Sequence, residues 1–234
     1  MKKSITKTML IVMIAMVSIM MVAQIARAAT GIATTKHDLS AVTGSGETEI
    51  CVFCHTPHFG GTGAPLWNRN NTATYTMYTN STSSTMDMLN VNGTTPGGVS
   101  AACLSCHDGA QAYDALINRP GSTLAGTGTP GTLKMTGAST MLLDGSASLT
   151  NDHPISIIYN NVAGAGGDAA FQPLVTTGTR GKITSAAGTV YFFGTGKNQM
   201  ECASCHDVHN GAGISPFLRF ANTSSQLCLT CHIK

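Results

Sequence analysis

The chain has 234 residues, of which only 10% are charged, and it contains 26 glycines and a single tryptophan. Four of its 13 basic residues lie within the first 28 positions, so the remaining chain carries nine basic and 11 acidic residues. This balance leaves no basic patch, which argues against nucleic-acid binding, and the shortage of large apolar side chains argues against a conventional hydrophobic core.

The first 28 residues have the organisation of a secretory signal peptide. A basic start is followed by an apolar run over residues 9–23, and Ala26-Arg27-Ala28 supplies a small-x-small cleavage pattern. The run is short for a membrane-spanning helix. We therefore expect residues 1–28 to be a signal peptide, residues 29–234 to be the mature domain, and the protein to be exported with no membrane span after cleavage.

The motif Cys-x-x-Cys-His occurs four times and uses every cysteine of the chain. The four copies are Cys51/Cys54/His55, Cys103/Cys106/His107, Cys202/Cys205/His206 and Cys228/Cys231/His232. This spacing is typical of c-type haem attachment, in which both thiols bond to the haem and the histidine binds the iron from one side. The sequence therefore predicts four covalent haem c groups.

Other uses of paired cysteines fit this pattern less well. Disulfides need no histidine after each pair, yet all four pairs have one. A structural zinc site needs two pairs that converge on one metal ion. A thioredoxin-like redox pair accounts for one Cys-x-x-Cys motif but not for four copies with four histidines.

The first and third motifs lie within a longer internal repeat. Cys51–Gly60 matches Cys202–Gly211 in the pattern Cys-x-x-Cys-His-x-x-His, and a proline follows at the same offset in both copies. A histidine in a similar context precedes each copy, and a second Cys-x-x-Cys-His follows it. We predict two modules, over residues 37–110 and 153–234, that form one body.

Regular secondary structure should be sparse. The mature chain is rich in Gly, Thr, Ser and Asn, a composition typical of disordered segments. Covalent haems would bury broad apolar surfaces and cross-link the chain, and small cross-linked proteins can fold without a conventional core. We predict a multihaem cytochrome c fold that consists mostly of ordered coil, with short helical turns around the haem motifs. A small hairpin is expected from residues 182–184 and 190–193, and a weak edge strand over residues 72–79.

Four histidines lie outside the motifs, at equivalent places in the repeat: His37, His58, His153 and His209. Their number equals the number of predicted irons, so we infer two histidine ligands at every haem. This tally leaves no open iron position for a substrate. The chain is therefore predicted to be an electron-transfer protein and not an enzyme, and its methionines are expected to pack against haem or lie in loops.

His58 and His209 each lie three residues after the histidine of a haem motif. Residues three apart in a helical turn share one face, with Cβ atoms roughly 5–6 Å apart, whereas the two axial ligands of one iron approach from opposite faces of the haem. Each must therefore serve another haem. The simplest assignment places His58 on the Cys103/Cys106 haem and His209 on the Cys228/Cys231 haem.

His37 and His153 then remain for the first haem of each module, in one of two schemes. Each histidine could close the haem of its own module. Alternatively, each could reach back one module, so that His37 would close the Cys202/Cys205 haem of a neighbouring subunit. The second scheme creates a head-to-tail interface, which grows into a filament if it does not close into a ring. Spacing alone does not choose between the schemes.

Seven segments occur in the order H-D-L-S, C-V-F-C-H-T-P-H, P-L-W-N-R, C-L-S-C-H-D-G, H-P-I-S, E-C-A-S-C-H-D-V-H and L-C-L-T-C-H. Together they resemble the OmcE-type tetrahaem c-type cytochromes of extracellular electron-conducting filaments. The resemblance covers most of the mature chain.

The resemblance implies a polymer in which haems of successive subunits form a continuous path and a histidine of one subunit ligates a haem in the next. On this chain His37 would be that histidine. The implied partners are copies of the chain itself, head to tail, and other redox proteins or extracellular electron acceptors. The implied location is extracellular or at the cell surface. The alternative is a soluble periplasmic tetrahaem shuttle, and a multihaem oxidoreductase is more remote.

Overall fold

The computed structural model describes most of the chain after residue 30. The described residues are 31–41, 47–61, 63–70, 73–79, 94–119, 133–137, 140–141, 147–163 and 167–234. The predicted signal peptide lies outside them. In the described part of the chain, no helix has the length and apolar character needed to cross a membrane.

Helices in the described residues are short, and the α-helices coincide with haem motifs. The longest of the described helices, α2 (Gly98–His107), contains the whole second motif, while α3 (Cys202–Cys205) holds both cysteines of the third motif and α4 (Gln226–Leu229) begins the fourth. Three 3-10 turns are η1 (Ile32–Thr34), η2 (Leu39–Ala41) and η4 (Thr223–Ser225). The first motif also forms a helical turn, because the amide of His55 donates to the carbonyl of Cys51 at 2.8 Å.

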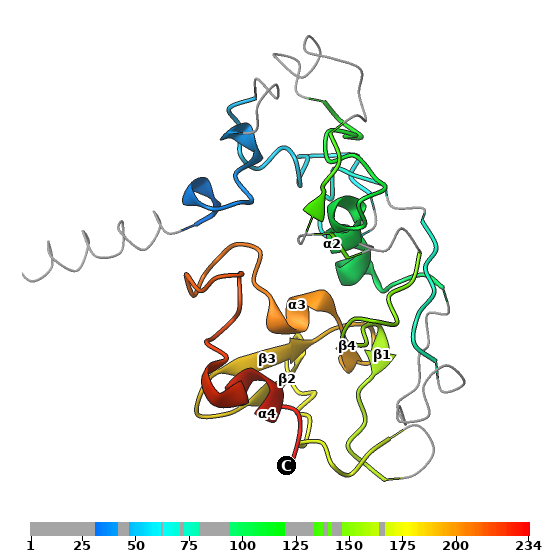
Figure 1. Ribbon diagram of the computed structural model, residues 1–234, viewed down its shortest axis with the longest axis vertical. Helices are drawn as coiled ribbons and strands as arrows, with labels where there is room; N and C mark the ends of the chain where they lie inside the picture. Colours follow the sequence, from blue (N-terminus) through cyan, green and yellow to red (C-terminus); the bar gives the residue numbers. More distant parts are fainter. Residues whose placement is uncertain are drawn as a thin grey trace, which may run out of the picture.

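Two antiparallel strand pairs form the sheet structure (Figure 1). Strands β2 (Gly181–Thr184) and β3 (Thr189–Phe192) pair from Gly181 with Phe192 to Thr184 with Thr189. Strand β1 (Ile157–Ile158) pairs with β4 (Gln199–Met200). The predicted hairpin is confirmed. The expected edge strand is wrong in its extent, because Thr76 makes only an isolated parallel bridge with Ser148.

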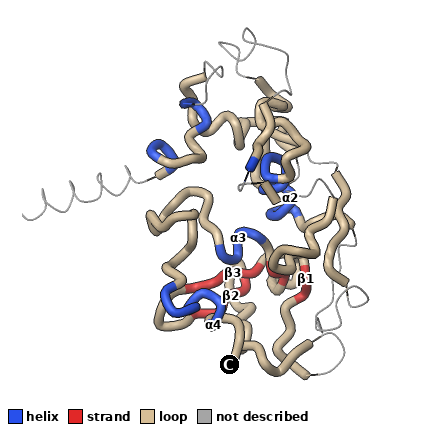
Figure 2. The backbone as a smooth tube through the Cα atoms, in the orientation of Figure 1, coloured by secondary structure: helices blue, strands red, loops and turns tan. Residues whose placement is uncertain are grey.

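Most of the described chain is coil between these short elements, as Figure 2 shows. This sparse structure confirms the predicted multihaem cytochrome type of fold. In Figure 1, α3 lies between α2 on one side and the β2–β3 hairpin with α4 on the other.

Buried apolar side chains form small separate clusters in the described residues. The largest belongs to the second module and consists of Ile157, Tyr159, Ile183, Val190, Phe192, Met200, Phe220 and Leu227. The first module has two smaller clusters, one around Tyr75 and Leu104 and one around Phe53 and Leu116. No single large core therefore joins the two halves among these residues.

Buried polar side chains hold the coil of the first module in place. Asn68 is fully buried, and its Nδ2 donates to the carbonyls of Val52 and Asn118, both at 2.8 Å. Arg69 is 2% exposed and its guanidinium donates to the carbonyls of Ser105, Ala112 and Tyr113 and to the Ser105 hydroxyl. These bonds replace the backbone ladders that regular secondary structure would provide. The end of α2 is thereby fixed to the segment that follows the first motif.

Candidate haem sites

The first and third motifs have matching local geometry, as the sequence repeat predicts. Nδ1 of His55 lies 3.0 Å from the carbonyl oxygen of Pro65, and Nδ1 of His206 lies 3.0 Å from that of Pro216. A carbonyl oxygen can only accept a hydrogen bond, so each Nδ1 carries the hydrogen. This leaves Nε2 of both rings free to bind a metal, and it is the usual way in which proteins orient a ligating histidine.

The chain after each of these motifs folds into a similar loop, which we call the first hook (residues 57–61 and 63–66) and the second hook (residues 208–217). The base of the first hook is closed by the Thr56 amide, which donates to Leu66 O at 2.8 Å. The second hook is closed by the Asp207 amide, which donates to Phe217 O at 2.7 Å. Leu66 and Phe217 both have the left-handed backbone that non-glycine residues seldom adopt, with φ of 53° and 61°. The repeat is therefore present in the backbone as well as in the sequence.

His209, in the second hook, faces His55 of the first motif. The two imidazole rings are nearly parallel, with an interplanar angle of 13°, and their centres are 6.3 Å apart. Metal–imidazole bonds are roughly 2 Å long, so two imidazoles on opposite sides of one metal ion have ring centres roughly 6 Å apart. The spacing fits a pair of axial ligands on one haem iron.

His37 and His107 form a second pair of this kind. Their ring centres are 6.0 Å apart, with an interplanar angle of 70°. The second hook also holds His37, because Phe217 stacks on its ring at 4.3 Å and the Val208 carbonyl lies 3.4 Å from its Nδ1. Burial, aided by repulsion from His107, lowers the pKa of His37, against the raising effect of the Val208 hydrogen bond. Burial therefore favours the neutral imidazole that a metal requires.

His153 lies close to His232 in the second module. Burial lowers the pKa of His232, and repulsion from His153 lowers it further. Nδ1 of His153 lies 2.9 Å from the carbonyl of Pro154, which orients this ring as Pro65 orients His55. The ring that packs on His232 is that of Phe171, with ring centres 4.5 Å apart, so His153 and His232 do not show the ring pairing found for His37 and His107.

These pairings differ from the simplest assignment made from the sequence. His209 lies opposite His55 and not beside the fourth motif, and His37 lies opposite His107 of its own chain. The structure gives His58 a ring contact with Phe59. The second hook crosses to the first module, so the nearest motif along the chain is not the nearest in space. A role of His37 as the ligand between subunits stays a prediction.

The cysteines of the motifs are free thiols; Cys51 and Cys228 are exposed and the other six are half-buried. Burial raises the pKa of Cys54 and Cys231 to about 12 and that of Cys205 to about 11. Among the described residues, no three His, Cys, Asp or Glu side chains gather where they could hold a metal ion. The described residues therefore give no cluster for a zinc site, and each cysteine pair stands next to the histidine of its own motif.

The second and third motifs meet where α2 packs on α3. Contact with the Cys202 thiol, together with burial, raises the pKa of Cys103, and the same contact lowers the pKa of Cys202. Cys103 and Cys202 are the first cysteines of their motifs, so the attachment points of two predicted haems lie side by side.

Glu201 fixes the junction between these two motifs. Its side chain is 1% exposed, and it accepts hydrogen bonds from the hydroxyls of Ser100 in α2 and Ser156, the latter at 3.1 Å. The Glu201 amide donates to Ser204 Oγ at 2.9 Å within the capping box that begins α3. Burial raises the pKa of Glu201, against the lowering effect of the serine hydrogen bonds. Glu201 therefore sets the position of Cys202 relative to α2.

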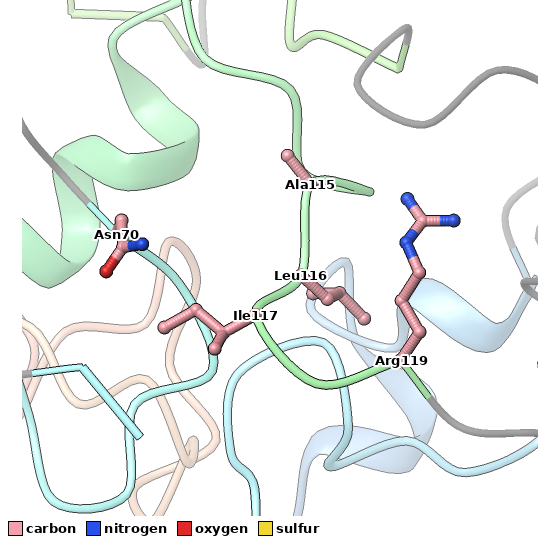
Figure 3. A pocket seen from close by; sticks show the side chains of 5 residues that line it. All are labelled: Asn70, Ala115, Leu116, Ile117 and Arg119. Atoms are coloured by element: carbon pink, nitrogen blue, oxygen red, sulfur yellow. The ribbon is translucent and has the colours of Figure 1, made fainter. Parts of the chain in front are cut away.

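An open hollow of about 330 Å³ lies in the loop after α2 (Figure 3). It is lined by Asn70, Ala115, Leu116, Ile117 and Arg119. Nη2 of Arg119 donates to the carbonyl of Asp114 at 2.7 Å. None of the predicted haem-site residues lines this hollow, and we assign it no role.

Comparison with known families matches residues 196–234 to the family described as Doubled CXXCH motif. The matched segment contains the third and fourth motifs. The paired motif implies covalent haem c and electron transfer. This match over residues 196–234 suggests a protein of the multihaem c-type cytochrome kind, and a comparison with curated proteins finds no match.

Pro65 and Pro216 have a role that their equal offset in the sequence does not reveal. The offset indicates only duplication. In the structure their carbonyl oxygens hold the histidines of the first and third motifs. The signal was available, because both prolines lie ten residues after the histidine that they orient.

Proposed function

We propose that this chain carries four covalent haem c groups, each with two histidine ligands, and that it is a subunit of an extracellular electron-conducting filament. The observation that carries the haem part is the agreement of two independent features. All eight cysteines belong to four motifs, and the motif histidines His55 and His107 each face a second histidine at a spacing that suits one iron.

Haem iron supplies a centre that gains and loses one electron. The residues of the chain hold and orient it: two thiols attach the ring, the motif histidine binds one side, and a backbone carbonyl fixes that histidine's tautomer at the first and third motifs. Ligation by histidine on both sides closes the iron to substrates, which supports electron transfer over catalysis. The cysteine contact between α2 and α3 supports passage of electrons between modules.

The filament part rests on the resemblance and on the histidine pairings. Two of the distal histidines, His209 and His37, lie opposite a motif histidine of the same chain. Closing a remaining haem from a second copy would link subunits head to tail. Copies of the chain, other redox proteins and extracellular acceptors are the proposed partners.

Three measurements on the secreted protein test the proposal. Intact mass and a pyridine haemochrome assay should give four haems per chain, and near-infrared magnetic circular dichroism should show ligation by two histidines. Negative-stain microscopy should show filaments. Fewer than four haems would contradict the haem count, and a protein that stays monomeric at all concentrations would instead be a periplasmic shuttle.

A further inference from the structure

Charge is distributed unevenly along the mature chain. Residues 29–168 contain four basic and nine acidic residues, whereas residues 169–234 contain five basic and two acidic residues. Of those two acids, Glu201 is buried, and the Asp207 carboxylate accepts hydrogen bonds from two amides of the second hook. The last part of the chain is therefore cationic, although the overall balance of charge predicts no basic patch.

Three cations gather on the outer side of the β2–β3 hairpin, around Tyr191. Lys182 lies directly opposite Tyr191 in the strand register, so both side chains are on the same face. The Arg180 guanidinium lies over the rings of Tyr191 and Phe193, at 5.8 and 5.6 Å from their centres. The Arg219 guanidinium lies 4.9 Å from the centre of the Tyr191 ring. We call these five residues the basic face.

The cations of the basic face have little compensation within the chain. Arg180 and Lys182 are exposed, and neither forms an ion pair with a described carboxylate. Burial lowers the pKa of Arg219; the Asp207 carboxylate opposes this effect, and repulsion from Arg180 adds to it. Two guanidinium groups thus lie close enough to repel each other. An anion beside them would relieve this repulsion, whereas another cation would increase it.

The basic face is joined to the third haem motif. Arg219 Nε donates to the carbonyl of Ala203, which lies between the two cysteines of that motif, at 2.8 Å. The Arg219 amide donates to the carbonyl of Cys205 at 2.9 Å. Strand β3 lies against α3, which holds both cysteines (Figure 1). A partner seated on the basic face would therefore lie beside the predicted attachment point of the third haem.

The chemistry of this face suits a protein partner. The face of a two-stranded hairpin is open, whereas small-molecule sites are usually concave. Nucleic-acid-binding proteins commonly neutralise roughly six to ten phosphates, which is more than this cluster of cations could contact. Aromatic side chains and arginines are enriched at protein interfaces, and complementary charges steer association. Contacts between electron-transfer proteins are small, which agrees with a face of this size.

We propose that the basic face is the docking site for an acidic electron-transfer protein, which exchanges electrons with the haem of the third motif. The inference rests on the proposed electron-transfer function and adds where a partner binds. Arg180 and Lys182 would contact acidic side chains of the partner, and Tyr191 and Phe193 would lie at the centre of the contact. When the partner donates, its redox group loses one electron and the haem iron gains it, and no bond forms or breaks.

The test compares three haem-loaded proteins: the wild type, the double variant Arg180→Gln/Lys182→Gln, and the control Lys36→Gln/Lys134→Gln. The control removes the same number of exposed positive charges from the first module. The probe is flavodoxin, a small acidic electron-transfer protein, and mitochondrial cytochrome c, which is basic, is the probe of opposite charge. Calorimetry measures the binding of oxidised flavodoxin, and stopped-flow absorbance measures electron transfer from reduced flavodoxin.

The expected effect depends on salt. At about 10 mM salt, where charges act over roughly 30 Å, the double variant should bind flavodoxin about tenfold more weakly than the wild type and accept its electrons about tenfold more slowly. The control should stay within about twofold of the wild type. At about 1 M salt the difference between the wild type and the double variant should disappear, because screening removes the attraction. Electron transfer to cytochrome c should not slow in the double variant, because the lost cations repel that probe.

The outcomes separate this inference from the proposed function. If the double variant binds flavodoxin as tightly as the wild type, or if the control loses as much affinity, the basic face is not the docking site. A DNA duplex that binds the wild type more tightly than flavodoxin does, and that the double variant no longer binds, would also overturn the protein partner. Loss of filaments in the double variant with unchanged flavodoxin binding would assign the face to a contact between copies and overturn the proposal. Titration with dithionite tests the proposed function by itself: fewer than four reducible haems would overturn that function, while calorimetry would still decide the role of the basic face.

Discussion

Arg69 offers a sharp test of how polar burial holds this coil together. Its guanidinium is 2% exposed and donates to the carbonyls of Ser105, Ala112 and Tyr113, with Nη1 to Tyr113 O at 2.5 Å and Nη2 to Ser105 O at 2.6 Å. Nε also donates to the Ser105 hydroxyl at 3.1 Å. Removing the side chain leaves three buried carbonyls without this partner, beside the turn that carries Cys106 and His107.

An unsatisfied buried polar group costs about 1–3 kcal/mol. Water that enters the space left by the side chain recovers part of this, and the cost of burying the cation is also removed. We therefore expect Arg69→Ala to lower the free energy of unfolding by about 2–4 kcal/mol. Arg69→Lys keeps the charge but lacks the planar guanidinium that reaches three carbonyls. It should therefore lower the free energy of unfolding by about half as much as Arg69→Ala.

The matched control is Arg180→Ala. Arg180 is exposed and lies over the rings of Tyr191 and Phe193 at 5.8 and 5.6 Å, a contact worth about 0.5–1 kcal/mol. Guanidinium unfolding of the haem-loaded variants, followed by Soret absorbance and far-UV circular dichroism, measures the difference. If Arg69→Ala unfolds at the same guanidinium concentration as Arg180→Ala, the reasoning from buried carbonyls is wrong.

Three other predictions follow from the same structure. His209→Ala should remove one axial ligand from the haem of the first motif, and His37→Ala one from the haem of the second motif. Each variant should then bind carbon monoxide at about one haem in four, and the double variant at about two in four. Absorption spectra that do not change when carbon monoxide is added would contradict the pairings. Glu201→Ala removes the hydrogen bonds from Ser100 and Ser156, so it should lower the free energy of unfolding by about 1–3 kcal/mol in a thermal unfolding experiment. A smaller loss would mean that other contacts position α3. Phe192→Ala, at a fully buried position, should cost about 3–5 kcal/mol in the same assay, and a smaller loss would show that the hairpin is not the centre of the second module's core.

The parts of the fold that could be predicted were those with a strong local signal. The β2–β3 hairpin could be predicted because two short runs that suit strands, residues 182–184 and 190–193, are separated by Ala-Ala-Gly. The helical turns were found because Cys-x-x-Cys-His spacing itself requires them. The two-residue strands β1 and β4 gave no such signal, because a pair of this length carries no periodicity.

The burial of polar residues could not be predicted from the sequence, for a different reason. Arg69 and Asn68 lie in a polar stretch, and such residues are usually on the surface. Only the three-dimensional path of residues 105–118 brings carbonyl groups to them. The same limit applies to Glu201, whose partners Ser100 and Ser156 are far away in the chain.

The residues of the haem sites could be read from composition and spacing, but their pairing could not. The number of distal histidines and the prediction that His58 and His209 serve other haems needed only the sequence. The partner of each histidine depends on the second hook, which carries His209 to His55 across 154 residues. Proximity along the chain was a poor guide because long connections, and not neighbouring turns, place these rings.

The scattered apolar clusters also bear on how such a protein matures. Within the described residues no common core joins the halves, and the tip of the second hook meets the first module mainly through His37 and His55. If the proposed haems are bound, they would supply much of the contact between the two halves of the chain. The chain would then be flexible before its haems are attached. A chain that lacks even one haem should therefore be degraded early by proteases.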